Sequence, residues 1–120
     1  MHTSIVIIGI GVDLIDIQRF KRLESSFVSF SKSLFTPDEM ELSVRSRAGN
    51  LALKEGLIKA GFLASHKQFR HITITRNFGS PILQSVDTSI INAMGQLKLS
   101  LSISYSKEIA CGLVVIESNI

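Results

Sequence analysis

One segment of this chain has the composition of a central, buried helix and yet contains a carboxylate. When residues 47–62 are projected at about 100° per residue, apolar side chains cover almost every direction. The residues around Glu55 are Ala48, Leu51, Ala52, Ile58 and Phe62, and the far side is covered by Leu53, Leu57 and Ala60. Only a narrow strip, formed by Arg47, Asn50, Lys54 and Gly61, is expected to face water. Such a helix needs other elements packed on nearly all of its surface.

The charge on Glu55 needs a partner, because burying an unpaired charge is expensive. One interpretation is an ion pair with Lys59, which lies one helical turn further on. The other is a metal or catalytic site built around the carboxylate. The helix by itself leaves both interpretations open.

Length and composition predict a single domain over residues 1–120. A chain of 120 residues is long enough to form a hydrophobic core without disulfides or a structural metal. Hydrophobic residues make up 45% of it, and the mean hydropathy of +0.31 is high for a sequence with no membrane segment. We therefore expect further apolar surface to be buried between subunits.

The single cysteine and the N-terminal apolar run indicate where in the cell the protein is expected. Cys111 lies in the apolar run 109–116 and has no partner for an intrachain disulfide, so we expect a buried, inert thiol. The apolar run 5–12 is too short to span a bilayer, and it lacks the basic leader and cleavage site of a signal peptide. These features predict a cytoplasmic protein that does not enter a membrane.

The net charge of +3 favours an acidic partner. The sequence has no run of Lys and Arg, no zinc-ligand spacing and no Trp, so nucleic acid is the least favoured candidate. An acidic protein or a phosphorylated small molecule fits the charge at least as well.

Residue patterns along the chain predict a mixed order of strands and helices. The clearest signal is residues 97–105, where apolar side chains alternate strictly with polar ones, as in a strand with one buried face. The expected elements are a buried strand over 4–12, a helix over 17–23 capped by Asp16, a helix start at Thr36–Pro37, the central helix, a strand over 71–75, a turn over 77–81, a helix over 88–94, and a hairpin of 97–105 with 109–117. This order predicts an α+β fold in which a small, largely antiparallel sheet packs on the central helix.

Three motifs in this order resemble those of the holo-[acyl-carrier-protein] synthase family, the small type of 4′-phosphopantetheinyl transferase. They are Gly-Ile-Gly-Val-Asp at 9–13, Lys-Glu-Gly-Leu-Ile-Lys-Ala at 54–60 and Ser-Ile-Ser-Tyr-Ser-Lys-Glu at 102–108. The segments 34–39 and 77–81 are also similar to connecting segments of the family. The resemblance extends over essentially the whole chain.

The resemblance implies a reaction and a metal. In this family the two motif carboxylates, here Asp13 and Glu55, hold Mg²⁺ on the pyrophosphate of coenzyme A. The phosphopantetheine arm is transferred to a serine hydroxyl of apo acyl carrier protein, and adenosine 3′,5′-bisphosphate is released. Lys59 is the catalytic residue expected on the phosphate, and Glu55, or water near it, is the candidate base. The alternative for Asp13 is a helix N-cap.

The resemblance also implies binding residues and an assembly. The positions implied for coenzyme A are Lys59, Arg47, Asn50, Gly79, Pro81, Ser104 and Tyr105. Arg19 and Arg22, on the first helix, are expected to receive the acidic helix of the carrier protein, with a solvated helix face as the alternative. The family is typically a homotrimer whose active sites lie at subunit interfaces.

This chain departs from the family pattern at three positions. Tyr105 replaces a histidine, and a tyrosine is not cationic at neutral pH. Asn50 replaces the phosphate-contacting arginine, for which Arg47 is a possible substitute one turn away, and Phe62 replaces a glycine. A catalytically weakened member that serves as a carrier-binding scaffold is therefore the second hypothesis.

Overall fold

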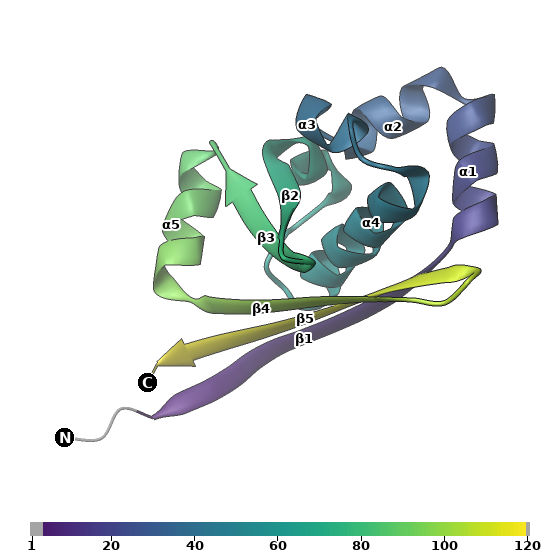
Figure 1. Ribbon diagram of the computed structural model, residues 1–120. Helices are drawn as coiled ribbons and strands as arrows, with labels where there is room; N and C mark the ends of the chain where they lie inside the picture. Colours follow the sequence, from purple (N-terminus) through teal and green to yellow (C-terminus); the bar gives the residue numbers. More distant parts are fainter. Residues whose placement is uncertain (1–3, 120) are drawn as a thin grey trace.

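The central helix lies across a three-stranded antiparallel sheet, and a separate two-stranded hairpin packs beside it (Figure 1). The structure, a computed structural model, describes residues 4–119. The elements are β1 (Ile5–Asp16), α1 (Ile17–Ser26), α2 (Val28–Leu34), α3 (Pro37–Met40), α4 (Val44–Lys59), the 3-10 helix η1 (His66–His71), β2 (Ile72–Asn77), β3 (Ser80–Ser85), α5 (Thr88–Gln96), β4 (Lys98–Tyr105) and β5 (Ile109–Asn119). The predicted α+β class is confirmed. No helix of the described residues is long and apolar enough to cross a membrane.

The larger sheet has the order β1-β5-β4, so the predicted C-terminal hairpin pairs with the N-terminal strand. The smaller sheet pairs β2 with β3. Helices α1, α2 and α3 cover the side of α4 away from the larger sheet, and α5 lies at the outer side of the hairpin (Figure 1).

Glycines allow α4 to lie directly on the sheet. A Cβ on Gly11 of β1 would collide with the carbonyl oxygen of Gly56, and a Cβ on Gly9 would collide with that of Ala60. Gly112 of β5 meets the backbone of Ala52 in the same way. The glycines of the 9–13 motif therefore bring β1 into backbone contact with α4, and this contact places Asp13 beside the helix.

The water-facing strip predicted for the central helix is wrong at two positions. Asn50 and Lys54 are completely buried. The Lys54 ammonium group donates to the Glu39 carboxylate at 2.6 Å and to the carbonyl oxygens of Leu34, Phe69 and Ile72. The buried charge is therefore on Lys54 and not on Glu55, because α3, η1 and β2 cover the face that the sequence pattern assigned to water.

The N-terminal strand is not buried in the protomer as predicted. β1 is at the edge of its sheet, and its side chains on the face away from α4 are exposed: Ile10 by 59%, Val12 by 50% and Leu14 by 61%. The thiol of Cys111, on the neighbouring strand β5, is free and only partly buried. The prediction of a buried thiol is therefore wrong for the protomer.

Several boundaries and two elements also differ from expectation. The segments Val28–Leu34 and Ser80–Ser85, which carried no clear period, form α2 and β3. The central helix begins earlier, because Ser43 caps it by accepting from the Ser46 amide. It ends at Lys59, and Gly61 follows with φ of +88°, a conformation that terminates helices and favours glycine.

Candidate active site

Asp13 and Lys59 form an ion pair across the contact between β1 and α4. The Lys59 Nζ atom donates to Asp13 Oδ1 at 2.9 Å and to the Val12 carbonyl oxygen at 3.1 Å. The Asp13 side chain is 21% exposed and that of Lys59 is 54% exposed. The N-cap of α1 is Asp16, which accepts from the Arg19 amide, whereas Asp13 lies inside β1. The capping alternative for Asp13 is therefore excluded.

Glu55 lies on the same helix as Lys59 but has a different partner. His66 Nε2, at the start of η1, lies 2.9 Å from Glu55 Oε1 and 3.1 Å from Oε2. The Glu55 side chain is 26% exposed, so it is neither fully buried nor paired with Lys59. His66 is a residue that the sequence analysis missed, since nothing in its local pattern links it to a glutamate eleven positions earlier.

Asp13 and Glu55 supply carboxylate oxygens, the ligand type that a hard cation prefers. Both are carboxylates, both are partly open to solvent, and each contacts one basic side chain that a dication could replace. Among the described residues, no three His, Cys, Asp or Glu side chains converge in a cluster able to hold a metal by themselves. Further ligands would therefore have to come from substrate or water.

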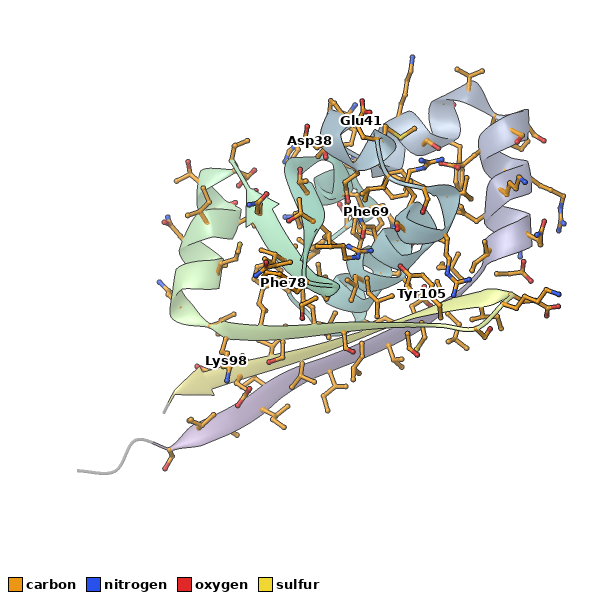
Figure 2. All side chains as sticks on the ribbon, in the orientation of Figure 1. Asp38, Glu41, Phe69, Phe78, Lys98 and Tyr105 are labelled. Carbon is orange, nitrogen blue, oxygen red and sulfur yellow. The ribbon has the colours of Figure 1, made fainter. Side chains whose placement is uncertain are left out.

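A second group of polar residues surrounds Tyr105, at the end of β4 beside α4 (Figure 2). The Arg45 guanidinium stacks over the Tyr105 ring, 4.5 Å from its centroid, and Arg76 Nη2 donates to the Tyr105 hydroxyl at 3.4 Å. A Cβ on Gly49 would collide with that hydroxyl, so the glycine makes room for it. Tyr105 faces α4, as the alternating pattern predicts, and Ser104 faces the exposed side.

Two residues expected at coenzyme A are engaged elsewhere. Asn50 is fully buried and donates to the Glu39 carboxylate and to the Ile74 carbonyl oxygen, so it cannot reach a bound ligand. Arg47 makes a bidentate ion pair with Glu24, at 2.9 and 2.8 Å, and donates to the Leu42 carbonyl oxygen. The prediction of a phosphate contact is wrong for Asn50, and Arg47 would have to break its ion pair to make one.

The predicted turn over 77–81 is a two-residue hairpin loop between β2 and β3. Phe78 has φ of 51° and Gly79 has φ of +85°, a combination typical of a type I′ turn. Phe78 is fully exposed at the tip (Figure 2). Gly79 therefore lies on a loop that is open to solvent, whereas Pro81 is the second residue of β3 and is partly buried.

The two predicted carrier-binding residues lie on the exposed side of α1. Arg19 and Arg22 are both exposed, and neither has an ion-pair partner among the described residues. Arg19 also borders a pocket of about 300 Å³ whose other walls include Leu14, Phe20 and Leu23.

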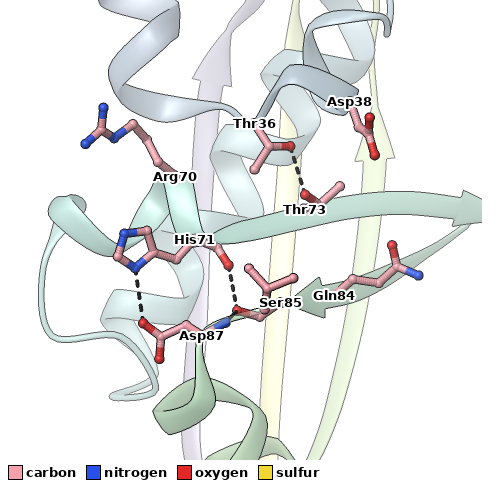
Figure 3. A pocket seen from close by; sticks show the side chains of 9 residues that line it. Thr36, Asp38, Arg70, His71, Thr73, Gln84, Ser85 and Asp87 are labelled. Carbon is pink, nitrogen blue, oxygen red and sulfur yellow. Dashed lines mark hydrogen bonds and ion pairs between the residues drawn. The ribbon is translucent and has the colours of Figure 1, made fainter.

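A pocket of about 570 Å³ lies elsewhere (Figure 3). It is bordered by the His71–Asp87 pair, whose Nδ1 and Oδ2 atoms are 3.2 Å apart, and by Asp38 from α3. None of the predicted site residues lines it. Asp87 is the N-cap of α5, and the hydrogen bond from the Ser89 side chain is the main reason why its pKa lies below its usual value.

The predicted catalytic and metal-binding residues lie apart from Tyr105 along α4. Asp13, Glu55 and Lys59 gather near the C-terminal half of α4, whereas Tyr105 and its arginines lie near the N-terminal half. Ser46, whose carbonyl oxygen accepts from Arg76, precedes Glu55 by nine residues. This spacing corresponds to about 14 Å along a helix.

Known proteins are similar to this chain in both sequence and fold. No family model matches the chain. The chain is 31% identical over 115 residues to the holo-[acyl-carrier-protein] synthase of Renibacterium salmoninarum, covering 94% of this chain and 100% of that protein. A second relative with the same name, from Pseudarthrobacter chlorophenolicus, is 33% identical over 114 residues, or 93% of this chain and 99% of the relative.

Solved structures agree with the sequence comparison. A holo-(acyl-carrier-protein) synthase from Bacillus anthracis in complex with CoA (3′,5′-ADP) is 29% identical, with a TM-score of 0.75 over 96% of this chain and 99% of that chain. The Neisseria meningitidis synthase is 27% identical, with a TM-score of 0.79 over 92% and 98%. The fold is thus that of the phosphopantetheinyl transferase class. Within this class, the chain belongs to the holo-[acyl-carrier-protein] synthase family.

Proposed function

We propose that the protein transfers the 4′-phosphopantetheine group from coenzyme A to a serine hydroxyl of apo acyl carrier protein. Adenosine 3′,5′-bisphosphate is the second product. The observation that carries this proposal is that Asp13 and Lys59, which the family motifs supply, form an ion pair across the contact between β1 and α4, one helical turn from the motif residue Glu55. The end-to-end similarity to holo-[acyl-carrier-protein] synthases supports it.

The residues at this contact have distinct proposed roles. The serine oxygen forms a bond to the β-phosphorus of coenzyme A, and the bond from that phosphorus to the bridging oxygen breaks. Lys59 is mobile enough, at 54% exposure, to turn from Asp13 to the phosphate oxygens on which negative charge grows. Glu55, directly or through a water molecule, accepts the serine proton.

Asp13 and Glu55 are the residues that we propose to hold Mg²⁺. Such an ion, when bound, supplies positive charge at the pyrophosphate. The pairing of each carboxylate with a basic side chain supports this assignment, since both pairs are partly exposed and exchangeable. Depletion of Mg²⁺ is expected to stop transfer.

We further propose that the protein is a homotrimer with active sites between subunits. Ile10, Val12 and Leu14 of β1, together with Leu113 of β5, leave an apolar face exposed that a second copy of the chain would cover. Asp13, Glu55 and Lys59 lie near one end of α4, and Tyr105 lies near the other. This separation also supports a site completed by Ser104, Tyr105, Gly79 and Pro81 of a neighbouring copy. Sedimentation equilibrium is expected to give three times the monomer mass.

We propose that Arg19 and Arg22 bind the acidic carrier protein, and that the enzyme acts in the cytoplasm in lipid and fatty acid biosynthesis. Both guanidinium groups are exposed and unpaired on α1, within the described residues. Charge reversal of both is expected to raise the KM for the carrier about tenfold while leaving the KM for coenzyme A unchanged. An unchanged carrier KM would exclude α1 as the docking surface.

The direct test is a transfer assay. The protein, coenzyme A, Mg²⁺ and apo carrier protein are incubated, and the carrier is examined by mass spectrometry for the gain of one phosphopantetheine. A matched reaction with chelator controls for the metal. Carrier binding without any mass gain would instead support the scaffold hypothesis, which the replacements at Tyr105 and Asn50 keep open.

A further inference from the structure

Glu55 and Lys59 do not form an ion pair with each other, although α4 places them at the spacing of one. They lie four residues apart, with the glutamate on the N-terminal side, which is the favourable order in a helix. Each is instead held by another element. Lys59 donates to Asp13 and to the Val12 carbonyl oxygen on β1. Glu55 contacts His66 at the start of η1, so two tertiary contacts replace the pair that the helix alone favours.

The segment after α4 fixes the position of His66. Ser65 and Gln68 form a capping box at the start of η1, in which the Gln68 side chain accepts from the Ser65 amide at 3.3 Å. The His66 ring packs against the ring of Phe69, with 5.0 Å between the centroids, and Phe69 is completely buried. The imidazole is therefore anchored to the core beside Glu55, even though its side chain is 64% exposed.

The contact between His66 and Glu55 leaves most of the carboxylate free. Nε2 lies 2.9 Å from Oε1 and 3.1 Å from Oε2, and an ionised carboxylate only accepts, so one N–H donor spans both oxygens. The two oxygens have about four acceptor positions in all, so the others stay open to a ligand. The Lys59 ammonium group would bring three donors and a full positive charge. It would therefore occupy the carboxylate more completely than the imidazole does.

Among the described residues, His66 is the only basic side chain paired with Glu55. Lys59 lies one turn further along the same helix and is 54% exposed, so its side chain can change partner. Without His66, Lys59 is the basic group placed to bind the Glu55 carboxylate.

We propose that His66 is a positioning residue that holds Glu55 away from Lys59 and so keeps both groups available for the reaction. The inference rests on the proposed function, in which Glu55 accepts the serine proton and Lys59 turns to the phosphate oxygens. A Glu55–Lys59 pair would have to break in every cycle before either group could act. His66 lies outside the motifs at 9–13, 54–60 and 102–108, so it is a residue that the family motifs do not supply.

Crystal structures of the His66→Ala and His71→Ala variants test the arrangement independently of activity. His71 is the matched control, because it also lies on η1 and also contacts a carboxylate. In His66→Ala, the Lys59 Nζ atom is expected within about 4 Å of a Glu55 carboxylate oxygen. In His71→Ala, Lys59 is expected to stay on Asp13. If Lys59 stays on Asp13 and away from Glu55 in both variants, the proposal is wrong.

Transfer kinetics test the catalytic consequence. His66→Ala is expected to lower kcat about tenfold, with the KM for the carrier protein and the melting temperature unchanged. His66→Gln keeps an N–H donor at a similar reach from the backbone, so it is expected to recover most of the native kcat. The control His71→Ala should stay within twofold of the native kcat.

The outcomes separate the positioning role from the proposed function. A native kcat in His66→Ala, or a loss in His66→Gln as large as that in His66→Ala, would overturn the positioning role and leave the proposed function intact. An equal loss in His71→Ala would show a general effect of changes in η1 and would also overturn it. A native protein that transfers nothing would overturn the proposed function, whereas the variant structures would still show whether His66 separates Glu55 from Lys59.

Discussion

Two neighbouring residues of α4, Lys54 and Glu55, carry opposite charges into opposite environments. Lys54 is fully buried, and its partner Glu39 is almost so. Burial lowers the pKa of Lys54, although the Glu39 carboxylate acts in the opposite direction. Glu55 is a quarter exposed and has the surface residue His66 as its partner. The first pair is part of the core, and the second can exchange its partner.

This contrast separates structural from functional charge. The Lys54 ammonium group contacts oxygens of α2, α3 and η1 at once, so it joins the elements that cover α4. The Asp13–Lys59 and Glu55–His66 pairs, by comparison, leave several carboxylate oxygen positions open to solvent. A ligand could therefore displace Lys59 or His66 without disturbing the core.

The largest expected effect comes from breaking the buried pair. Lys54→Met leaves the Glu39 carboxylate buried without its partner, and we expect a loss of about 3–5 kcal/mol in the free energy of unfolding. Lys59→Met, the matched change in the exposed pair, should cost less than about 1 kcal/mol. Urea denaturation measures both. Equal losses would show that the two pairs do not differ as described.

Neutralising the exposed carboxylates should reduce the rate of transfer strongly and change the stability little. Asp13→Asn and Glu55→Gln are each expected to reduce transfer by about 100-fold or more, because each removes a proposed ligand of the pyrophosphate-bound ion. Stability should change by less than about 1 kcal/mol. Initial rates and thermal melting are measured on the same samples. Native rates at limiting Mg²⁺ would contradict the metal assignment.

The Glu24–Arg47 pair lies between these extremes, since its side chains are 11% and 12% exposed. Burial alone would raise the pKa of Glu24, but hydrogen bonds from Arg47 and Ser31 outweigh it and hold this pKa below its usual value. A carboxyl of this kind stabilises the fold above its unfolded pKa and loses this contribution as the pH falls through its folded pKa.

Glu24→Gln should therefore be less stable than the native protein at neutral pH, by about 1–2 kcal/mol. The difference should shrink as the pH falls below the ordinary glutamate value of 4.5. Denaturation curves collected from neutral to acidic pH measure it. A difference that does not depend on pH would mean that packing, and not charge, makes the contribution.

The smallest effect is expected at the tip of the β2–β3 hairpin. Phe78 adopts a left-handed conformation that asparagine tolerates better, and its ring is fully exposed, so it gains no stability from burial. Phe78→Asn should stabilise the protein by up to about 1 kcal/mol. Phe78→Leu, which has no such backbone preference, is the control. Loss of stability in Phe78→Asn would show that the exposed ring contributes to the fold.

Periodicity predicted the elements whose patterns are unambiguous. The alternation over 97–105, the Asp16 cap and the apolar central helix all correspond to observed elements. The segments that became α2 and β3 carry no clear period, because each is short and owes its conformation to contacts with its neighbours. The prediction that the first strand is buried is wrong for one face of β1, because an apolar run does not reveal whether another element of the same chain covers it.

The sequence by itself determined the α+β class, the family and the three motif residues Asp13, Glu55 and Lys59, because residue types at fixed spacing carry that information. Only the tertiary structure decided which charge of α4 is buried, since that depends on α3, η1 and β2, which lie elsewhere in the chain. It also brought Arg45 and Arg76 to Tyr105 and paired His66 with Glu55. Contacts between distant segments arise from the packing of whole elements, and no local pattern records them.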